Sequence, residues 1–144
     1  MRVLIADDQK SVGTTLAHLV SECNHEVVEV VSSGLEAIQA YNRHNPDVVL
    51  MDYWMSKLNG GTACRNILAK DPSARVILVS GWSHLEDLDN SGAVSVLSKP
   101  VDIYQLEYAL NAAASRPYEP VVQQNEVIDP IVPFEPDFLT AVGQ

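Results

Sequence analysis

The chain is poor in basic residues and in cysteine. It has nine Lys and Arg against nineteen Asp and Glu, and this acidity argues against a nucleic-acid-binding surface. Its two cysteines, Cys23 and Cys64, fall in helical patterns, and we expect reduced core residues rather than a disulfide. No charged-then-apolar leader precedes residue 2, and no apolar run approaches the roughly 18 residues of a membrane helix. The composition predicts a cytoplasmic protein with no nucleic-acid partner and no membrane segment.

Short aliphatic stretches alternate along the chain with segments of helical periodicity. Runs of four or five aliphatic residues between polar turns are typical of strands buried on both faces of a sheet. We expect strands at 2–6, 26–32, 48–51, 76–79 and 94–97. The helical segments are 11–23, 34–43, about ten residues after Gly60-Gly61, a short fourth near 83–90, and a fifth from 102 to about 116. Strict β–α alternation predicts an α/β fold, a doubly wound five-stranded parallel sheet.

Polar residues mark three of the expected helix starts. Ser11 is a possible cap for the first helix. Ser83, three residues before a Glu, forms a capping-box pattern for the fourth helix. Asp102 with Gln105 gives a similar start to the fifth.

Functional groups gather where four of the expected strands end. The residues that follow these strands are Asp7, Asp8, Asp52, Ser80 and Lys99. In open parallel sheets, ligands bind beyond the carboxyl ends of the strands. Singly, each residue has an ordinary explanation: an acidic pair can cap a helix, and Ser-Gly is common in turns. Together they predict one site containing three carboxylates, a hydroxyl and an ammonium group.

The last part of the chain differs in composition from the rest. Residues 117–144 hold five of the eight prolines, five acidic residues and no basic ones, so they carry half of the net charge. Aliphatic pairs such as Val121-Val122 and Val127-Ile128 recur between the prolines. We expect a body over 1–116 and a Pro-rich acidic tail over 117–144, which forms an extended strap on a surface.

The body resembles the receiver domain of bacterial two-component response regulators, a flavodoxin-like (βα)5 fold with strand order 2-1-3-4-5. The resemblance covers residues 1 to about 116. The matching pieces are Asp7-Asp8, Asp52 followed by Met55 and Gly60, Ser80-Gly81, and Gly92-Ala93 with Leu97-Ser98-Lys99-Pro100.

This resemblance implies a metal site in which each residue has a role. Asp8 and Asp52 would bind one Mg²⁺ (or Mn²⁺) together with the main-chain carbonyl of Trp54, and Asp7 would act largely through a bound water. Hard cations of this kind prefer oxygen ligands and retain waters that a phosphate can replace.

The same resemblance makes Asp52 the phosphoacceptor. Phosphoryl transfer to a carboxylate requires a nucleophile and groups that compensate the charge on three phosphoryl oxygens. Lys99 would pair with one of these oxygens. Ser80 would donate its hydroxyl to another.

Several positions depart from the family pattern. Ser56 replaces a proline that usually follows the methionine, and Val96 stands where the family usually carries Tyr or Phe, which puts the usual signalling relay in doubt. Both tryptophans, Trp54 and Trp82, lie two residues after site residues. Their indole rings either shield the phosphorylation pocket or form an interface, and the two are compatible.

We therefore predict a stand-alone receiver, a phosphorylation-controlled switch whose output is protein contact. A sensor histidine kinase or phosphotransfer protein would supply the phosphoryl group, a downstream protein would read the switch, and a homodimer is possible. The chain would not be an enzyme beyond supporting its own phosphorylation and dephosphorylation. The alternative is a pseudo-receiver adaptor that signals through constitutive contacts of Trp54, Trp82 and the tail.

Overall fold

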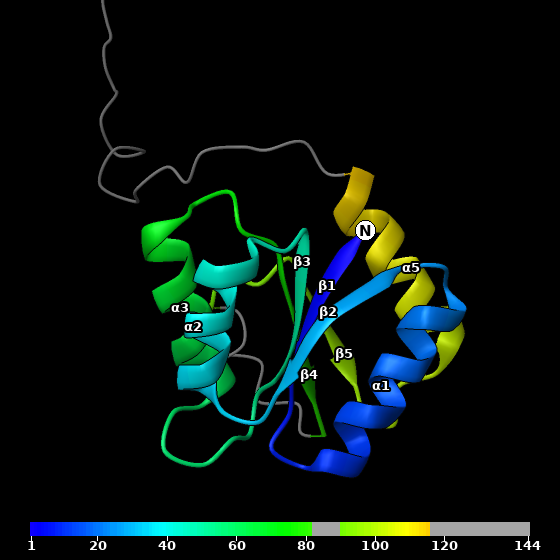
Figure 1. The fold of residues 1–144 in the computed structure, drawn as a ribbon, viewed down its shortest axis with the longest axis horizontal. Helices are drawn as coiled ribbons and strands as arrows, with labels where there is room; N and C mark the ends of the chain where they lie inside the picture. Colours follow the sequence, from blue (N-terminus) through cyan, green and yellow to red (C-terminus); the bar gives the residue numbers. More distant parts are fainter. Residues whose placement is uncertain (82–89, 116–144) are drawn as a thin grey trace, which may run out of the picture.

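The computed structural model describes residues 1–81 and 90–115. In this part of the chain, five parallel strands form one sheet in the order β2-β1-β3-β4-β5 (Figure 1). The strands are β1 (Arg2–Ala6), β2 (Glu26–Val31), β3 (Val48–Asp52), β4 (Val76–Ser80) and β5 (Ser95–Ser98). The predicted α/β class, the parallel pairing and the strand order are confirmed.

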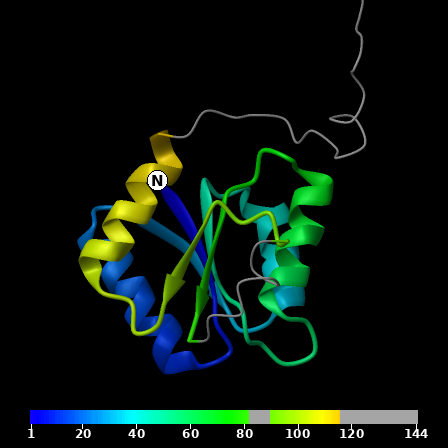
Figure 2. The ribbon, with the colours of Figure 1, turned by 180° about the vertical axis from the view of Figure 1, so that it is seen from behind.

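Four helices are described: α1 (Lys10–Glu22), α2 (Gly34–His44), α3 (Gly60–Lys70) and α5 (Ile103–Ser115). α1 and α5 lie on one face of the sheet and α2 and α3 on the other, as Figures 1 and 2 show from opposite sides. The fourth helix expected near Ser83 and the tail expected over 117–144 lie outside the described residues. Among the described helices, none is long and apolar enough to span a membrane.

The three central strands are buried on both faces, as their aliphatic runs predict. Every residue of β3 and of β4 is buried, and so are residues 3–6 of β1. Alternate side chains enter two separate cores. Val3, Ile5 and Leu50 pack with α1 and α5, whereas Leu4 and Met51 pack with α2 and α3.

The helix starts confirm one predicted cap and correct another. Asp102 accepts a hydrogen bond from the Gln105 N–H at 2.8 Å, as expected. The prediction of Ser11 as the cap of α1 is wrong, because the helix begins at Lys10 and Ser11 lies inside its first turn. The chain turns earlier, where Asp7 Oδ1 accepts the N–H of Gln9 at 2.9 Å.

The other two caps were not anticipated from the sequence. Ser33 accepts from the Glu36 N–H at 3.1 Å, and Asn59 accepts from the Thr62 N–H at 2.9 Å. Both are ordinary capping residue types whose side chains satisfy free N–H groups of the first turn.

Both cysteines are free thiols, as expected. Cys64 is fully buried on the inner side of α3, and this burial raises the pKa of its thiol to about 12. A thiol of this kind is protonated at neutral pH and chemically inert. Cys23 is partly exposed at the end of α1.

Candidate functional site

Strand register brings the predicted site residues to one edge of the sheet. Ala6 of β1 pairs with Met51, Asp52 of β3 pairs with Val79, and Ser80 of β4 pairs with Ser98. The strands thus end at similar levels, and the residues after them share one edge.

Three carboxylates form the acidic centre of this edge. Asp7, Asp8 and Asp52 each offer an oxygen, and these oxygens all lie within 4.8 Å of one another. Asp7 and Asp52 are buried, whereas Asp8 is exposed and open to an ion from solvent. The oxygen donor set fits a hard divalent cation.

Lys99 joins two of the carboxylates. Its Nζ lies 3.1 Å from Oδ2 of Asp7 and 3.2 Å from Oδ1 of Asp52. The lysine comes from the segment after β5, where the Lys99–Pro100 peptide is cis. Sequence reasoning assigned Lys99 to a phosphoryl oxygen and did not anticipate that it bridges two acids here.

The two charges of this ion pair modify each other's titration. Burial raises the pKa of Asp52 and the nearby Asp7 carboxylate raises it further, while Lys99 and the Trp54 N–H partly offset this. Burial by itself would lower the pKa of Lys99, but attraction to Asp52 and Asp7 raises it overall. The lysine therefore remains a cation at neutral pH.

Trp54 contacts the site through its main chain and reaches solvent through its ring. Its N–H donates to the Asp52 carboxylate. Trp54 is 49% exposed as a residue, and its ring packs edge-to-face on the buried Tyr53, with ring centroids 5.0 Å apart. The role predicted for the Trp54 carbonyl remains a prediction, and Trp82 lies outside the described residues.

Ser80 is buried at the last position of β4, directly after Val79, which pairs with Asp52 in the sheet. The structure therefore brings together the three acids, Lys99 and the end of β4, as the sequence predicted. The other departure, Val96, is 42% exposed on β5.

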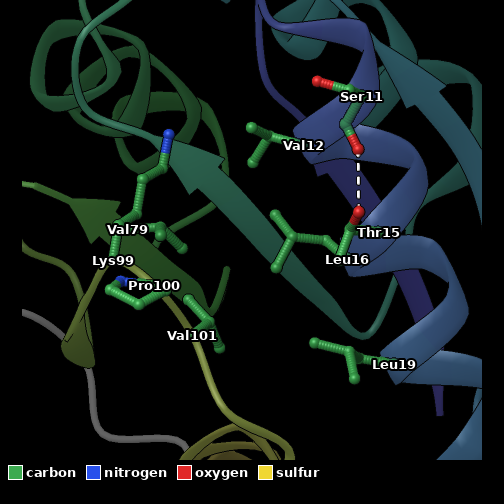
Figure 3. A pocket seen from close by; sticks show the side chains of 9 residues that line it. All are labelled: Ser11, Val12, Thr15, Leu16, Leu19, Val79, Lys99, Pro100 and Val101. Atoms are coloured by element: carbon green, nitrogen blue, oxygen red, sulfur yellow. Dashed lines mark hydrogen bonds between the residues drawn. The ribbon is translucent and has the colours of Figure 1, made fainter.

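An apolar pocket of about 410 Å³ lies beside the acidic centre (Figure 3). One wall is α1, with Val12, Leu16 and Leu19, and the other contains Lys99 and Val101. Figure 3 shows these aliphatic side chains facing one another across the space between the helix and the end of the sheet. No feature of the sequence pattern predicted this pocket, since it forms between segments far apart in the chain.

Known proteins share both the sequence pattern and the geometry. The sequence model of the protein family described as response regulator receiver domain matches residues 3–111 of this chain. Chemotaxis protein CheY of Listeria monocytogenes is 34% identical over 117 residues, covering 79% of this chain and 98% of that protein. CheY of Thermotoga maritima is 31% identical over 113 residues, covering 76% and 94%.

Solved structures agree with this result. A receiver domain protein from Clostridium thermocellum is 29% identical with a TM-score of 0.73, covering 78% of this chain and 92% of that one. The CheX–CheY–BeF3–Mg complex from Borrelia burgdorferi gives 27% identity and a TM-score of 0.76, with coverage of 81% and 90%.

The fold and the acidic edge define a CheY-like receiver. The chain belongs to the response regulator receiver domain family. Its pocket of Asp7, Asp8 and Asp52 is consistent with two-component signalling by aspartate phosphorylation. Apart from supporting its own phosphorylation, such a domain is not an enzyme.

Proposed function

We propose that Asp52 accepts a phosphoryl group and that this event switches the contacts of the protein. The arrangement of Asp52 and Lys99 supports this most directly, because a buried carboxylate stands next to a cation 3.2 Å away at an open sheet edge. Buried carboxylates without a chemical role are rarely clustered in this way, since like charges repel at short range.

The reaction is a displacement at phosphorus. A carboxylate oxygen of Asp52 attacks the phosphorus of a phosphohistidine, the P–O bond of an acyl phosphate forms and the P–N bond breaks. The leaving imidazole keeps the electron pair of that bond and takes up a proton. Burial desolvates the nucleophile and raises its pKa, and Lys99 favours its charged form by offsetting part of that rise in pKa.

Asp7, Asp8 and Asp52, with the main-chain carbonyl of Trp54, would hold a Mg²⁺ or Mn²⁺ ion. The bound cation would compensate negative charge on the phosphoryl oxygens. Its oxygen donors come from segments that the sheet register already aligns.

Lys99 and Ser80 would read the phosphorylated state. Once the negative charge moves from the carboxylate to the phosphoryl group, the ammonium of Lys99 follows it and leaves Asp52. Ser80 would donate its hydroxyl to a second phosphoryl oxygen and draw the segment after β4 toward the site.

The phosphodonor would be a sensor histidine kinase or a phosphotransfer protein, and the output a downstream protein. The pocket between α1 and Val101 supports this partner class, because it offers an apolar anchor next to Lys99. An amphipathic helix carrying the donor histidine fits such a surface.

Incubation with acetyl phosphate and Mg²⁺, followed by intact mass measurement, tests the proposal. We expect one added phosphoryl mass in the wild type and none in Asp52→Asn. Asp47→Asn, just before the opposite end of β3, is the matched control and should label normally. Labelling that persists in Asp52→Asn would refute the assignment.

One alternative has a specific observation in its favour. Val96 replaces the aromatic residue of the family pattern, and Trp54 presents half of its ring to solvent. A pseudo-receiver adaptor would signal through such contacts without phosphorylation. Failure of the wild type to label with any donor would favour this function.

A further inference from the structure

An apolar groove lies between the edge strand β5 and α5. Its volume is about 550 Å³, and its walls are residues 95–98 on the strand and one side of α5 from Tyr104 to Ala112. Three large side chains along it are exposed: Val96 by 42%, Tyr104 by 80% and Tyr108 by 79%. Contiguous exposed apolar surface of this kind marks a binding site.

Within the described part of the chain, the groove also contains one buried hydroxyl group without a hydrogen-bond partner and the outer edge of a strand. Ser95 Oγ is buried and has no hydrogen-bond partner among the residues that the structure describes. β5 is the last strand of the described sheet. Because Lys99 N–H donates to Ser80 on β4 at 3.0 Å and Ser80 pairs with Ser98, alternation turns the main-chain groups of Val96 and Ser98 outward. An occupant with main-chain donors and aliphatic side chains would complement both features.

The sequence beyond α5 supplies such an occupant. The chain continues for 29 residues after Ser115, and the groove begins at Ala112, one helical turn earlier. From the end of α5 back to Tyr104 is about 17 Å along the helix axis. An extended chain covers about 3.1 Å per residue, so the segment from Pro117 to Val122 spans about that distance.

We propose that residues 117–128 lie extended in the β5–α5 groove of the same chain, with Val121 against Tyr108 and Val122 against Tyr104. The tail would thereby cover an apolar face of its own body. A protein that binds this face would first have to displace the tail.

The mode of docking follows from the handedness of the fold. α5 packs on the same face as α1, and the connection β1–α1–β2 leads toward the β2 edge of the sheet. A parallel strand added beyond β5 would need a connection through α5 that leads away from the β2 edge. Because α5 lies on the same face as α1 but this connection would run in the opposite direction along the sheet, its crossover would be left-handed. Such crossovers are almost unknown. The tail therefore docks by its side chains and does not add a sixth parallel strand.

Disulfide trapping in the full-length protein tests the proposal. Cys23→Ser removes the accessible thiol, and Cys64 is fully buried. In this background, Tyr108→Cys with Val121→Cys places two thiols where the tail should meet the groove, and mild oxidation should link them within one chain. The matched control is Leu35→Cys with Val121→Cys, because Leu35 is 58% exposed on α2, on the opposite face.

We expect the Tyr108 pair to close at least about tenfold faster than the control pair, since docking raises the local concentration of the two thiols. Intact mass and non-reducing gels separate the products. Equal rates in the two pairs would overturn the proposal. A covalent dimer as the main product would also overturn it and would identify a second copy as the occupant.

Tyr104→Cys with Val122→Cys is the second pair, to be used if circular dichroism shows that the first variant does not fold. Both tyrosines are mostly exposed, so their loss should cost little stability. Because no phosphodonor and no metal are added, the result does not depend on the function proposed for Asp52.

Discussion

The ammonium group of Lys99 lies 3.2 Å from Oδ1 of Asp52 and thereby ties the segment after β5 to the end of β3. The same ammonium reaches Asp7 at 3.1 Å. One cation thus compensates two buried acids, and it competes for them with any metal ion that enters the cluster.

Replacing Lys99 by Met should therefore change metal binding and phosphorylation in opposite directions. Removal of the cation leaves the acids more attractive to Mg²⁺, so the affinity for Mg²⁺ should rise. Loss of a charge-assisted contact to the phosphoryl group should slow labelling by about tenfold or more. Calorimetry and timed intact mass measure the two effects.

Lys70→Met is the control for this variant, because Lys70 is exposed at the end of α3. It should leave both quantities unchanged. A fall in Mg²⁺ affinity in Lys99→Met would contradict the competition between the lysine and the metal ion.

Asp8 should govern metal binding more than any other exposed acid of the described chain. Asp8→Asn removes one charged ligand, and we expect Mg²⁺ affinity to fall by about tenfold, in line with a loss of roughly 1.4 kcal/mol. Trp54 reports the binding, because its N–H donates to Asp52 and its ring is half exposed. A Mg²⁺ titration of tryptophan fluorescence in a Trp82→Phe background measures it.

The Asp47→Asn variant provides the comparison for this titration. Equal Mg²⁺ affinity in Asp8→Asn and in Asp47→Asn would remove Asp8 from the site.

The sequence was sufficient to predict the strands and the acidic edge, because both depend on local patterns. Aliphatic runs identify buried parallel strands, and parallel strands bring Asp7 and Asp52 to one edge. The bridge from Lys99 to both acids was not predictable, since it depends on side-chain distances across three strands. Ser11 was misassigned because the turn into the helix starts four residues earlier, at Asp7, whose side chain accepts the Gln9 N–H.

The hydrogen bond between Tyr41 and Asp71 should contribute to stability in a pH-dependent way. Tyr41 donates to Asp71 Oδ2 at 2.7 Å, and Ser73 donates to Oδ1 at 2.6 Å. The Ser73 hydroxyl and then the Tyr41 hydroxyl lower the pKa of Asp71 in the folded state. Tyr41→Phe should lower the free energy of unfolding by about 1 kcal/mol at neutral pH.

The sign of the pH dependence follows from that lowered pKa. The stabilisation is fully present above the unfolded pKa of about 3.9, and it is lost as pH falls through the lower folded value. The difference between Tyr41→Phe and wild type should therefore shrink below about pH 4. Urea unfolding at several pH values measures it, with the exposed Tyr108→Phe as control. A difference that grows in acid would contradict this account.

Gly60 should be essential to the shape of the loop that follows Asp52. A methyl group on Gly60 would clash with the main-chain oxygen of Asp52 and would lie only 2.9 Å from Tyr53 Cα. The Gly60 N–H also donates to the Tyr53 carbonyl at 2.7 Å, so the two backbones cannot separate without losing this bond. Gly60→Ala should destabilise the fold by about 2 kcal/mol or more, and it should also slow phosphorylation because it displaces Asp52.

Gly81→Ala is the matched comparison for Gly60→Ala, because an added methyl there meets no atom of the described residues within 4 Å. Its free energy of unfolding should stay within about 0.5 kcal/mol of the wild type. Urea unfolding of both variants, with phosphorylation followed by intact mass, makes the comparison. Equal stability of Gly60→Ala and Gly81→Ala would show that the loop can move away from β3 at no cost, and Asp52 would then not be held by the contact with Gly60.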